Sequence, residues 1–186
     1  MATAKDAHHH PQPNTNRCRV LIPIRDRLYS REALHKYLEE MAAKDDIVFL
    51  VFILGPEDYD ILNPVGMGPR VQPRVDAKRL ENSQRIRREA VLMVQERGIE
   101  VHDYETVEDD LAVGITNAVK KYKADHVVLG ESKSLRRFIK SRISDYVRSH
   151  SGAVVTVVTE KHSKLLGSVP WSGIKHGEYM QLTGFD

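Results

Sequence analysis

Cysteine pairs, long apolar runs and a strong net charge are all missing from this sequence. Cys18 is the only cysteine, so no disulfide can form within the chain, which fits a reducing compartment. No apolar run reaches the roughly 18 residues that span a bilayer, and the polar amino terminus has no apolar signal core. The net charge of +2 gives no general attraction to nucleic acid or to a membrane surface. We therefore expect a cytoplasmic protein with no nucleic-acid partner and no membrane insertion.

The residue patterns of common metal and catalytic centres are missing as well. His102, His126 and His150 are dispersed without ligand spacing, and His8–His10 lies in a polar tail that offers no fixed geometry, so we expect no metal site. No G-x-S-x-G nucleophile elbow occurs. No general base or Lys-Ser/Thr phosphate loop accompanies the basic segment described below. The sequence therefore predicts a protein that is not an enzyme.

Length and composition indicate one globular domain with a flanking segment at each end. The chain has 186 residues, of which 41% are hydrophobic and 29% are charged, an ordinary mixture. Residues 1–16 carry almost no apolar side chain and are predicted to form a disordered tail. The domain is expected over residues 17–160. Residues 161–186 form an extension without clear periodicity, in which Trp171 is expected to fold back on the domain or to contact a second subunit.

Apolar strands alternate with amphipathic helices along the domain. Strands are predicted at 17–24, 46–54, 99–105, 125–130 and 153–159. Helices are predicted at 30–44 with Ser30 as the N-cap, at 75–97, from Thr106 onward and at 135–147. A long loop rich in proline and glycine covers 55–74. The alternation predicts an α/β fold, a doubly wound five-stranded parallel sheet with helices on both faces. Such a sheet binds ligands beyond the carboxyl ends of its strands, where the strand order reverses.

The segment Gly130–His150 has the pattern of a phosphate-binding loop followed by a helix. A predicted strand ends at Gly130, which is interpreted as a tight turn, and the hydroxyl groups of Ser132 and Ser134 follow. The N–H groups and the dipole at the start of the next helix favour an anion. Positive charge is concentrated in this segment at Lys133, Arg136, Arg137, Lys140 and Arg142. A solvated basic helix face after a glycine turn explains the same pattern equally well.

From Arg17 to Thr159, the order of elements and the local sequence resemble the universal stress protein family. Ser144-Asp145-Tyr146-Val147 matches the helix signature of that family, and Pro23 is common at its place. The resemblance implies a Rossmann-like sheet of the HUP type with strand order 3-2-1-4-5, and a non-enzymatic regulatory role in the stress response. It also implies a homodimer formed through the strand at 153–159, because an apolar edge strand left open promotes aggregation.

The resemblance also places a nucleotide or another phosphorylated ligand against the residues that end and follow strands one and four. The site residues it implies are Pro23, Arg25, Asp26, Gly130, Ser132, Lys133, Ser134, Ser141, Arg142 and Ser144. Nucleotide-binding members have an aspartate at the place of Arg25, a second glycine at that of Lys133, and a Gly-Ser pair where this chain has Ser141-Arg142. Because Arg25 can only donate and the side chain of Lys133 obstructs a triphosphate, ATP is expected to bind weakly.

Two further interpretations stay open. The spacing of Gly130, Ser132 and Ser134 resembles the stress-protein domain of potassium-sensing histidine kinases, some of which bind a cyclic dinucleotide. The candidate ligands are therefore AMP, ATP and a cyclic dinucleotide. The alternative is a dimeric interaction module that has lost ligand binding and that serves a transporter or a sensor kinase.

Overall fold

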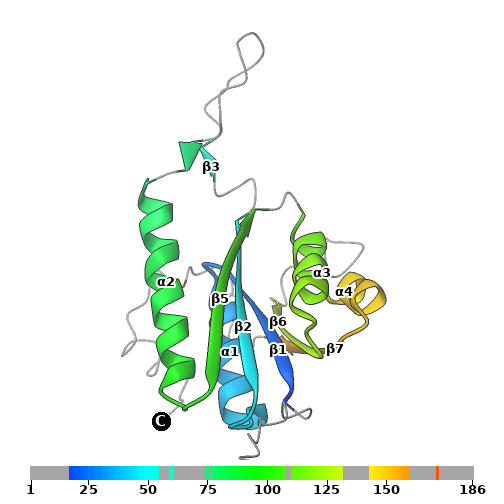
Figure 1. Cartoon of the computed structure of the whole chain (residues 1–186). Helices are drawn as coiled ribbons and strands as arrows, with labels where there is room; N and C mark the ends of the chain where they lie inside the picture. Colours follow the sequence, from blue (N-terminus) through cyan, green and yellow to red (C-terminus); the bar gives the residue numbers. More distant parts are fainter. Residues whose placement is uncertain are drawn as a thin grey trace, which may run out of the picture.

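A five-stranded parallel sheet forms the centre of the computed structural model, which describes residues 17–54, 59–60, 74–75, 77–107, 110–131 and 143–159 together with Trp171 (Figure 1). The strand order is β5-β2-β1-β6-β7. These strands are β1 (Arg19–Ile24), β2 (Ile47–Leu54), β5 (Glu100–Val107), β6 (His126–Glu131) and β7 (Val154–Thr159). In order along the chain they are strands one to five of the sheet, so the predicted order 3-2-1-4-5 and the predicted α/β fold are confirmed.

Helices cover both faces of the sheet. One core cluster joins the sheet to α1 and α2, and a second joins it to α3 and α4 (Figure 1). The helices are α1 (Leu28–Lys36), α2 (Ala77–Gln95), α3 (Leu111–Tyr122) and α4 (Ile143–Ser151). The region predicted as a loop at 55–74 contributes to a short antiparallel ladder between β3 (Tyr59–Asp60) and β4 (Arg74–Val75). The remainder of that region lies outside the described residues.

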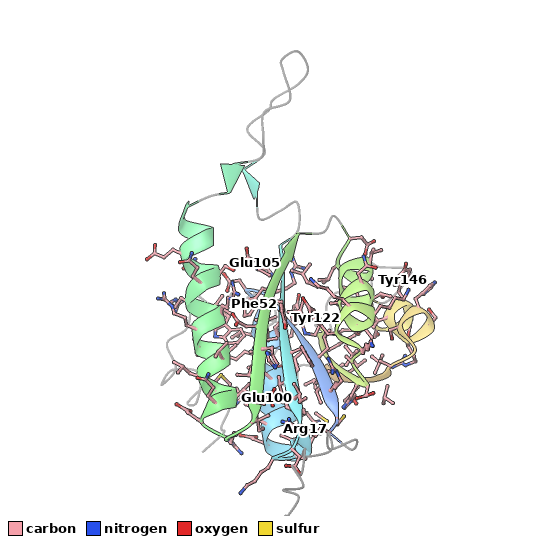
Figure 2. All side chains as sticks on the ribbon, viewed as in Figure 1. Arg17, Phe52, Glu100, Glu105, Tyr122 and Tyr146 are labelled. Atoms are coloured by element: carbon pink, nitrogen blue, oxygen red, sulfur yellow. The ribbon has the colours of Figure 1, made fainter. Side chains whose placement is uncertain are left out.

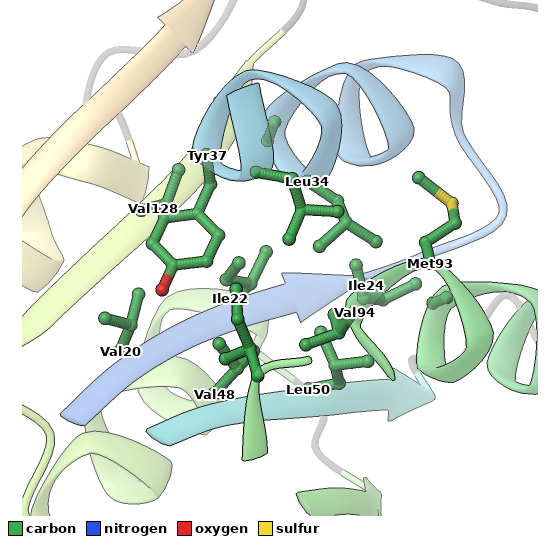
Figure 3. Close-up of a cluster of buried hydrophobic side chains, with 14 of the residues drawn as sticks. Val20, Ile22, Ile24, Leu34, Tyr37, Val48, Leu50, Met93, Val94 and Val128 are labelled. Atoms are coloured by element: carbon green, nitrogen blue, oxygen red, sulfur yellow. The ribbon is translucent and has the colours of Figure 1, made fainter. Parts of the chain in front are cut away.

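Side chains of the central strands alternate between the two cores. In β1, Val20, Ile22 and Ile24 belong to the cluster shared with α1 and α2, whereas Leu21 belongs to the cluster shared with α3 and α4. Figure 3 shows Ile22 and Ile24 close to Leu34 of α1 in the first cluster. Because successive residues of a strand point to opposite faces and both faces are covered, every position must be apolar. This explains the uninterrupted apolar runs that the sequence shows for β1 and β2.

The carboxyl end of α1 widens into a π-helical turn, η1 (Tyr37–Met41). The amide of Ala42 donates to the carbonyl oxygen of Tyr37 at 2.8 Å, five residues back instead of four. The hydroxyl group of Tyr37 is buried and donates to Asp46 Oδ2 at 2.6 Å. The turn and this buried hydrogen bond hold the connection between α1 and β2.

Two predicted helix starts are wrong. Arg27, in an extended conformation, is the N-cap of α1, and Ser30 is buried inside the helix at 3% exposure instead of capping it. Thr106 lies inside β5, which pairs with β2 along its whole length. α3 begins later, where Asp110 accepts hydrogen bonds from two amides of the first turn at 2.8 and 3.2 Å. In both places, packing against the sheet overrides the local capping preference.

Candidate functional site

β1 and β6 separate toward their carboxyl ends. Their register covers two residue pairs, the second of which is Leu21 with Val127. Over the same distance β1 stays paired with β2, and β6 stays paired with β7, along all six residues. β1 and β6 are also the strands between which the order of the sheet reverses. Open α/β sheets bind ligands at such a point.

Pro23 accounts for part of this separation. The amide of Arg19 donates to Asp125 Oδ2 at 2.9 Å, and its carbonyl oxygen accepts from the amide of Asp125 at 2.8 Å, so Arg19 faces the β6 side. Because the facing direction alternates along a strand, Pro23 faces the same side four residues later. Proline has no N–H, so it cannot continue the ladder with β6.

The turn after β1 places two arginines next to the amino end of α1. The amide of Arg27 donates to the carbonyl oxygen of Arg25 at 2.7 Å, and Arg25, Asp26 and Arg27 are half-buried. Arg27, the N-cap residue of α1, makes no capping hydrogen bond with its side chain, and the first turn contains no acidic residue. Backbone donors and guanidinium groups therefore occur together here, which favours an anion.

Gly130 lies inside β6 and supports a close backbone contact instead of the tight turn expected from the sequence. A Cβ atom at Gly130 would lie 2.5 Å from the carbonyl carbon of Tyr29 and 3.1 Å from the amide nitrogen of Ser30. The first turn of α1 therefore rests directly on the carboxyl end of β6. A glycine is required because it has no Cβ atom, and its backbone conformation is an ordinary one for a strand.

The amino end of α4 already has an acidic partner from the same chain. Glu131, the last residue of β6, accepts a hydrogen bond at Oε1 from the amide of Ser144 at 3.1 Å. Ser144 is itself 3% exposed. The carboxylate of Asp110 occupies the amino end of α3 in the same way. Two helices at this edge thus carry a carboxylate at their positive end.

One protein family matches the sequence over most of its length. The match to the universal stress protein family covers residues 17–159, from just before β1 to the end of β7. The chain belongs to the universal stress protein family.

Solved structures of universal stress proteins share its fold. One from Burkholderia pseudomallei is 16% identical with a TM-score of 0.56, and the match covers 78% of this chain and 98% of that one. One from Arabidopsis thaliana with AMP bound is 14% identical with a TM-score of 0.55, covering 79% and 94%. A third, in complex with cAMP, is 14% identical with a TM-score of 0.54, covering 77% and 97%. Among curated proteins, no sequence matches the chain.

Half of the ten predicted site residues are described in this universal stress protein, and they lie at one edge of the sheet. Pro23, Arg25 and Asp26 lie at the end of β1 and in the turn after it, Gly130 lies in β6, and Ser144 lies in the first turn of α4. The other predicted site residues lie outside the described residues and stay predictions: Ser132, Lys133, Ser134, Ser141 and Arg142.

The ionisable groups with shifted pKa values lie at the opposite, amino edge of the sheet. Burial raises the pKa of the Cys18 thiol and of the Tyr37 hydroxyl, and burial lowers the pKa of His126. A hydrogen bond from Arg17 at 2.7 Å lowers the pKa of Glu100 (Figure 2). These shifts follow from burial and pairing within the fold. A thiol with a raised pKa is a weak nucleophile, which fits an inert Cys18.

The sequence gives little sign of two contacts that shape this edge. The carboxylate of Glu131 reaches an amide 13 residues later, and the Tyr29 backbone approaches a glycine about 100 residues later. Both depend on how α1 and α4 pack on the sheet, and neither leaves a local pattern. Among the described residues, no group of three or more His, Cys, Asp or Glu side chains could hold a metal ion. None of the described helices is long and apolar enough to cross a membrane.

Proposed function

We propose that this protein is a non-enzymatic regulator that binds an adenine nucleotide, or another phosphorylated ligand, at the carboxyl edge between β1 and β6. The observation that supports this most directly is the separation of these two strands after Leu21 and Val127, next to the amino end of α1, where the side chain of the N-cap residue makes no capping hydrogen bond. A binding role, rather than a catalytic one, agrees with the position of the shifted pKa values at the opposite edge.

The chemistry of the edge favours a ligand with few negative charges. Arg25 and the backbone of the first turn of α1 would hold one phosphate, and Pro23, Asp26 and Gly130 would border the ligand. The carboxylate of Glu131 occupies the amino end of α4, which a second phosphate would otherwise use. AMP or a cyclic nucleotide therefore suits this edge better than ATP. Solved family members with AMP and with cAMP bound are consistent with such a ligand.

The five predicted residues outside the described part would complete the site. The hydroxyl groups of Ser132, Ser134 and Ser141 and the cationic groups of Lys133 and Arg142 would contact the phosphate from the side of β6. Charge-assisted hydrogen bonds of this kind are the strong ones in phosphate recognition. A cyclic dinucleotide, with one charge on each phosphate, remains a candidate ligand for the same reason.

Calorimetric titration with AMP, cAMP, ATP and a cyclic dinucleotide tests the proposal. We expect AMP or a cyclic nucleotide to bind more tightly than ATP, and Arg25→Ala to weaken that binding by about ten- to hundredfold, since a hydrogen bond to a charged group contributes about 1.5–3 kcal/mol. Lys44→Ala is the matched control, because Lys44 is exposed at the amino edge. If none of the four ligands binds, or if the two variants lose affinity equally, the proposed site is refuted.

A second candidate function is that of a dimeric interaction module without a ligand. β7 is an edge strand, and Val154 in it is 68% exposed. An open apolar edge of this kind is normally covered, and pairing with β7 of a second copy would cover it. A stable dimer that binds none of the four ligands would favour this function over the first.

A further inference from the structure

Trp171, the only tryptophan of the chain, is completely buried although it lies beyond the last strand of the sheet. It belongs to the core cluster that joins the sheet to α1 and α2. Its indole N–H donates to Glu89 Oε2 of α2 at 3.1 Å. Its ring lies 5.5 Å from the guanidinium carbon of Arg31 in α1. A single side chain from the carboxyl-terminal region therefore contacts both helices of one face.

Trp171 completes the surroundings of a buried ion pair. The side chain of Arg31 has no exposed surface, and its guanidinium group lies 2.6 Å from Glu89 Oε1. A buried ion pair is stable only when nearby groups satisfy and cover it. The indole contributes to both, because its N–H donates to the same carboxylate and its ring lies against the guanidinium group. We call Arg31, Glu89 and Trp171 the clasp.

The clasp acts on the part of α1 that borders the candidate ligand site. Arg31 follows Tyr29 by two residues, and the backbone of Tyr29 is the one that rests on Gly130 of β6. The turn at Arg25–Arg27 lies immediately before it. The first turn of α1 is thus held from the sheet side by Gly130 and from the helix side by the clasp.

We propose that Trp171 is a positioning residue for the ligand site, which it serves by holding the first turn of α1 against β6. This proposal rests on the proposed function, because its expected consequence is that loss of the indole weakens nucleotide binding. Coupling between two sites is reciprocal. A bound nucleotide therefore also protects Trp171.

Intrinsic fluorescence tests the clasp directly, because Trp171 is the only tryptophan. We expect a blue-shifted emission that acrylamide quenches poorly, and weaker quenching still when AMP is bound. Glu89→Ala should move the emission to the red, whereas Glu89→Gln, which keeps an acceptor for the indole N–H, should move it less. An emission typical of water-exposed indole in the wild-type protein would overturn the proposal.

Hydrogen exchange tests the positioning of α1 without any ligand. In Trp171→Ala we expect the amides of residues 32–34, which donate to the carbonyl oxygens of the first turn of α1, to exchange at least tenfold faster, and in Trp171→Phe, which keeps a ring, we expect a smaller increase. Val119→Ala is the control, since it removes a buried side chain from the opposite core, at α3. If both alanine variants accelerate exchange at 32–34 equally, Trp171 contributes only to general stability and the proposal is overturned. If Trp171→Ala does not fold, Trp171→Phe and Glu89→Gln carry the same comparison.

AMP titration of the same variants separates this proposal from the proposed function. We expect about tenfold weaker AMP binding in Trp171→Ala, a smaller loss in Trp171→Phe and no change in Val119→Ala. If the wild-type protein binds AMP and Trp171→Ala binds it equally well, the positioning role is overturned while the proposed function stands. If the wild-type protein binds no nucleotide, the proposed function fails, and the exchange rates at 32–34 still decide whether Trp171 positions α1.

Discussion

Replacing Gly130 by alanine should destabilise the protein strongly, because the added methyl group meets backbone atoms. Its Cβ atom would lie 2.5 Å from the Tyr29 carbonyl carbon, and the carbonyl oxygen is nearer still. Real Cβ contacts essentially never fall below 3.0 Å, so α1 and β6 must move apart by at least 0.5 Å. Overpacking of a tight core costs about 1–3 kcal/mol. We expect the upper end of this range, about 3 kcal/mol, because a backbone cannot rotate away as a side chain can.

Urea denaturation of wild type and variant measures the loss, and a thermal melt should show a midpoint lower by about 6–12 °C. Gly98→Ala is the matched control. Gly98 has a φ of +70° and no atom within 4 Å of a Cβ atom, so alanine there adds backbone strain without a clash. We expect that control to cost about 1 kcal/mol. If Gly130→Ala costs no more than Gly98→Ala, the inferred contact between α1 and β6 is wrong.

Three other changes follow from contacts described above. Glu131→Gln should strengthen AMP binding about fivefold, as measured by calorimetry. The substitution removes the negative charge that competes with phosphate at the amino end of α4, and a charge at a helix amino end contributes about 1 kcal/mol. Burial lowers the pKa of His126 in the folded protein below the ordinary value of 6.5. As the pH falls through 6.5, the unfolded chain therefore binds this proton more readily than the folded protein does. The free energy of unfolding, measured with urea, should therefore decrease as the pH is lowered from about 7 to 5, and His126→Gln should reduce this decrease. Lysines at Val155 and Val157 should convert a homodimer to monomer or aggregate, which light scattering detects.

Each of these predictions has its own control. Glu39→Gln, at an exposed position in η1 at the opposite edge of the sheet, should leave AMP binding unchanged, and an equal gain in both variants would point to general charge rather than to Glu131. If the free energy of unfolding falls equally in the wild-type protein and in His126→Gln as the pH is lowered, the pH dependence does not come from His126. An unchanged dimer mass after the two lysine substitutions in β7 would show that the interface lies elsewhere.

The parallel sheet could be predicted from the sequence because burial on both faces leaves a strong signal. The predicted strand at 46–54, in which the eight residues after Asp46 are all apolar, became β2 with a boundary shift of one residue. Strand order depends on which strands pair across long distances, and it came from the family resemblance. The start of α1 could not be predicted from the local sequence. Ser30 is a good capping residue in isolation, but packing on the sheet buries it in the first turn of the helix.

Some features of the candidate site could be predicted from the sequence, and others could not. Pro23 and Arg25 were identified through the family resemblance, which places ligand contacts at the end of the first strand and directly after it. The role of Gly130 was misread, since a glycine at the end of a strand predicts a turn and does not reveal a helix backbone pressed against it. Trp171 could be recognised as an apolar side chain in a polar extension. Its contact with Arg31 could not be predicted, because the two residues come from distant parts of the chain.

The π-helical turn at the end of α1 has a consequence for how the protein unfolds in parts. Because the Ala42 amide bonds to Tyr37, the carbonyl oxygen of Leu38 loses its usual partner, and the guanidinium group of Arg97 donates to it at 3.2 Å. Arg97 follows α2 directly, so this bond fastens the carboxyl ends of α1 and α2 to each other. Local opening of a protein proceeds in cooperative blocks. α1 and α2 should therefore open together as one such block, with equal exchange free energies, while α3 and α4 open in another.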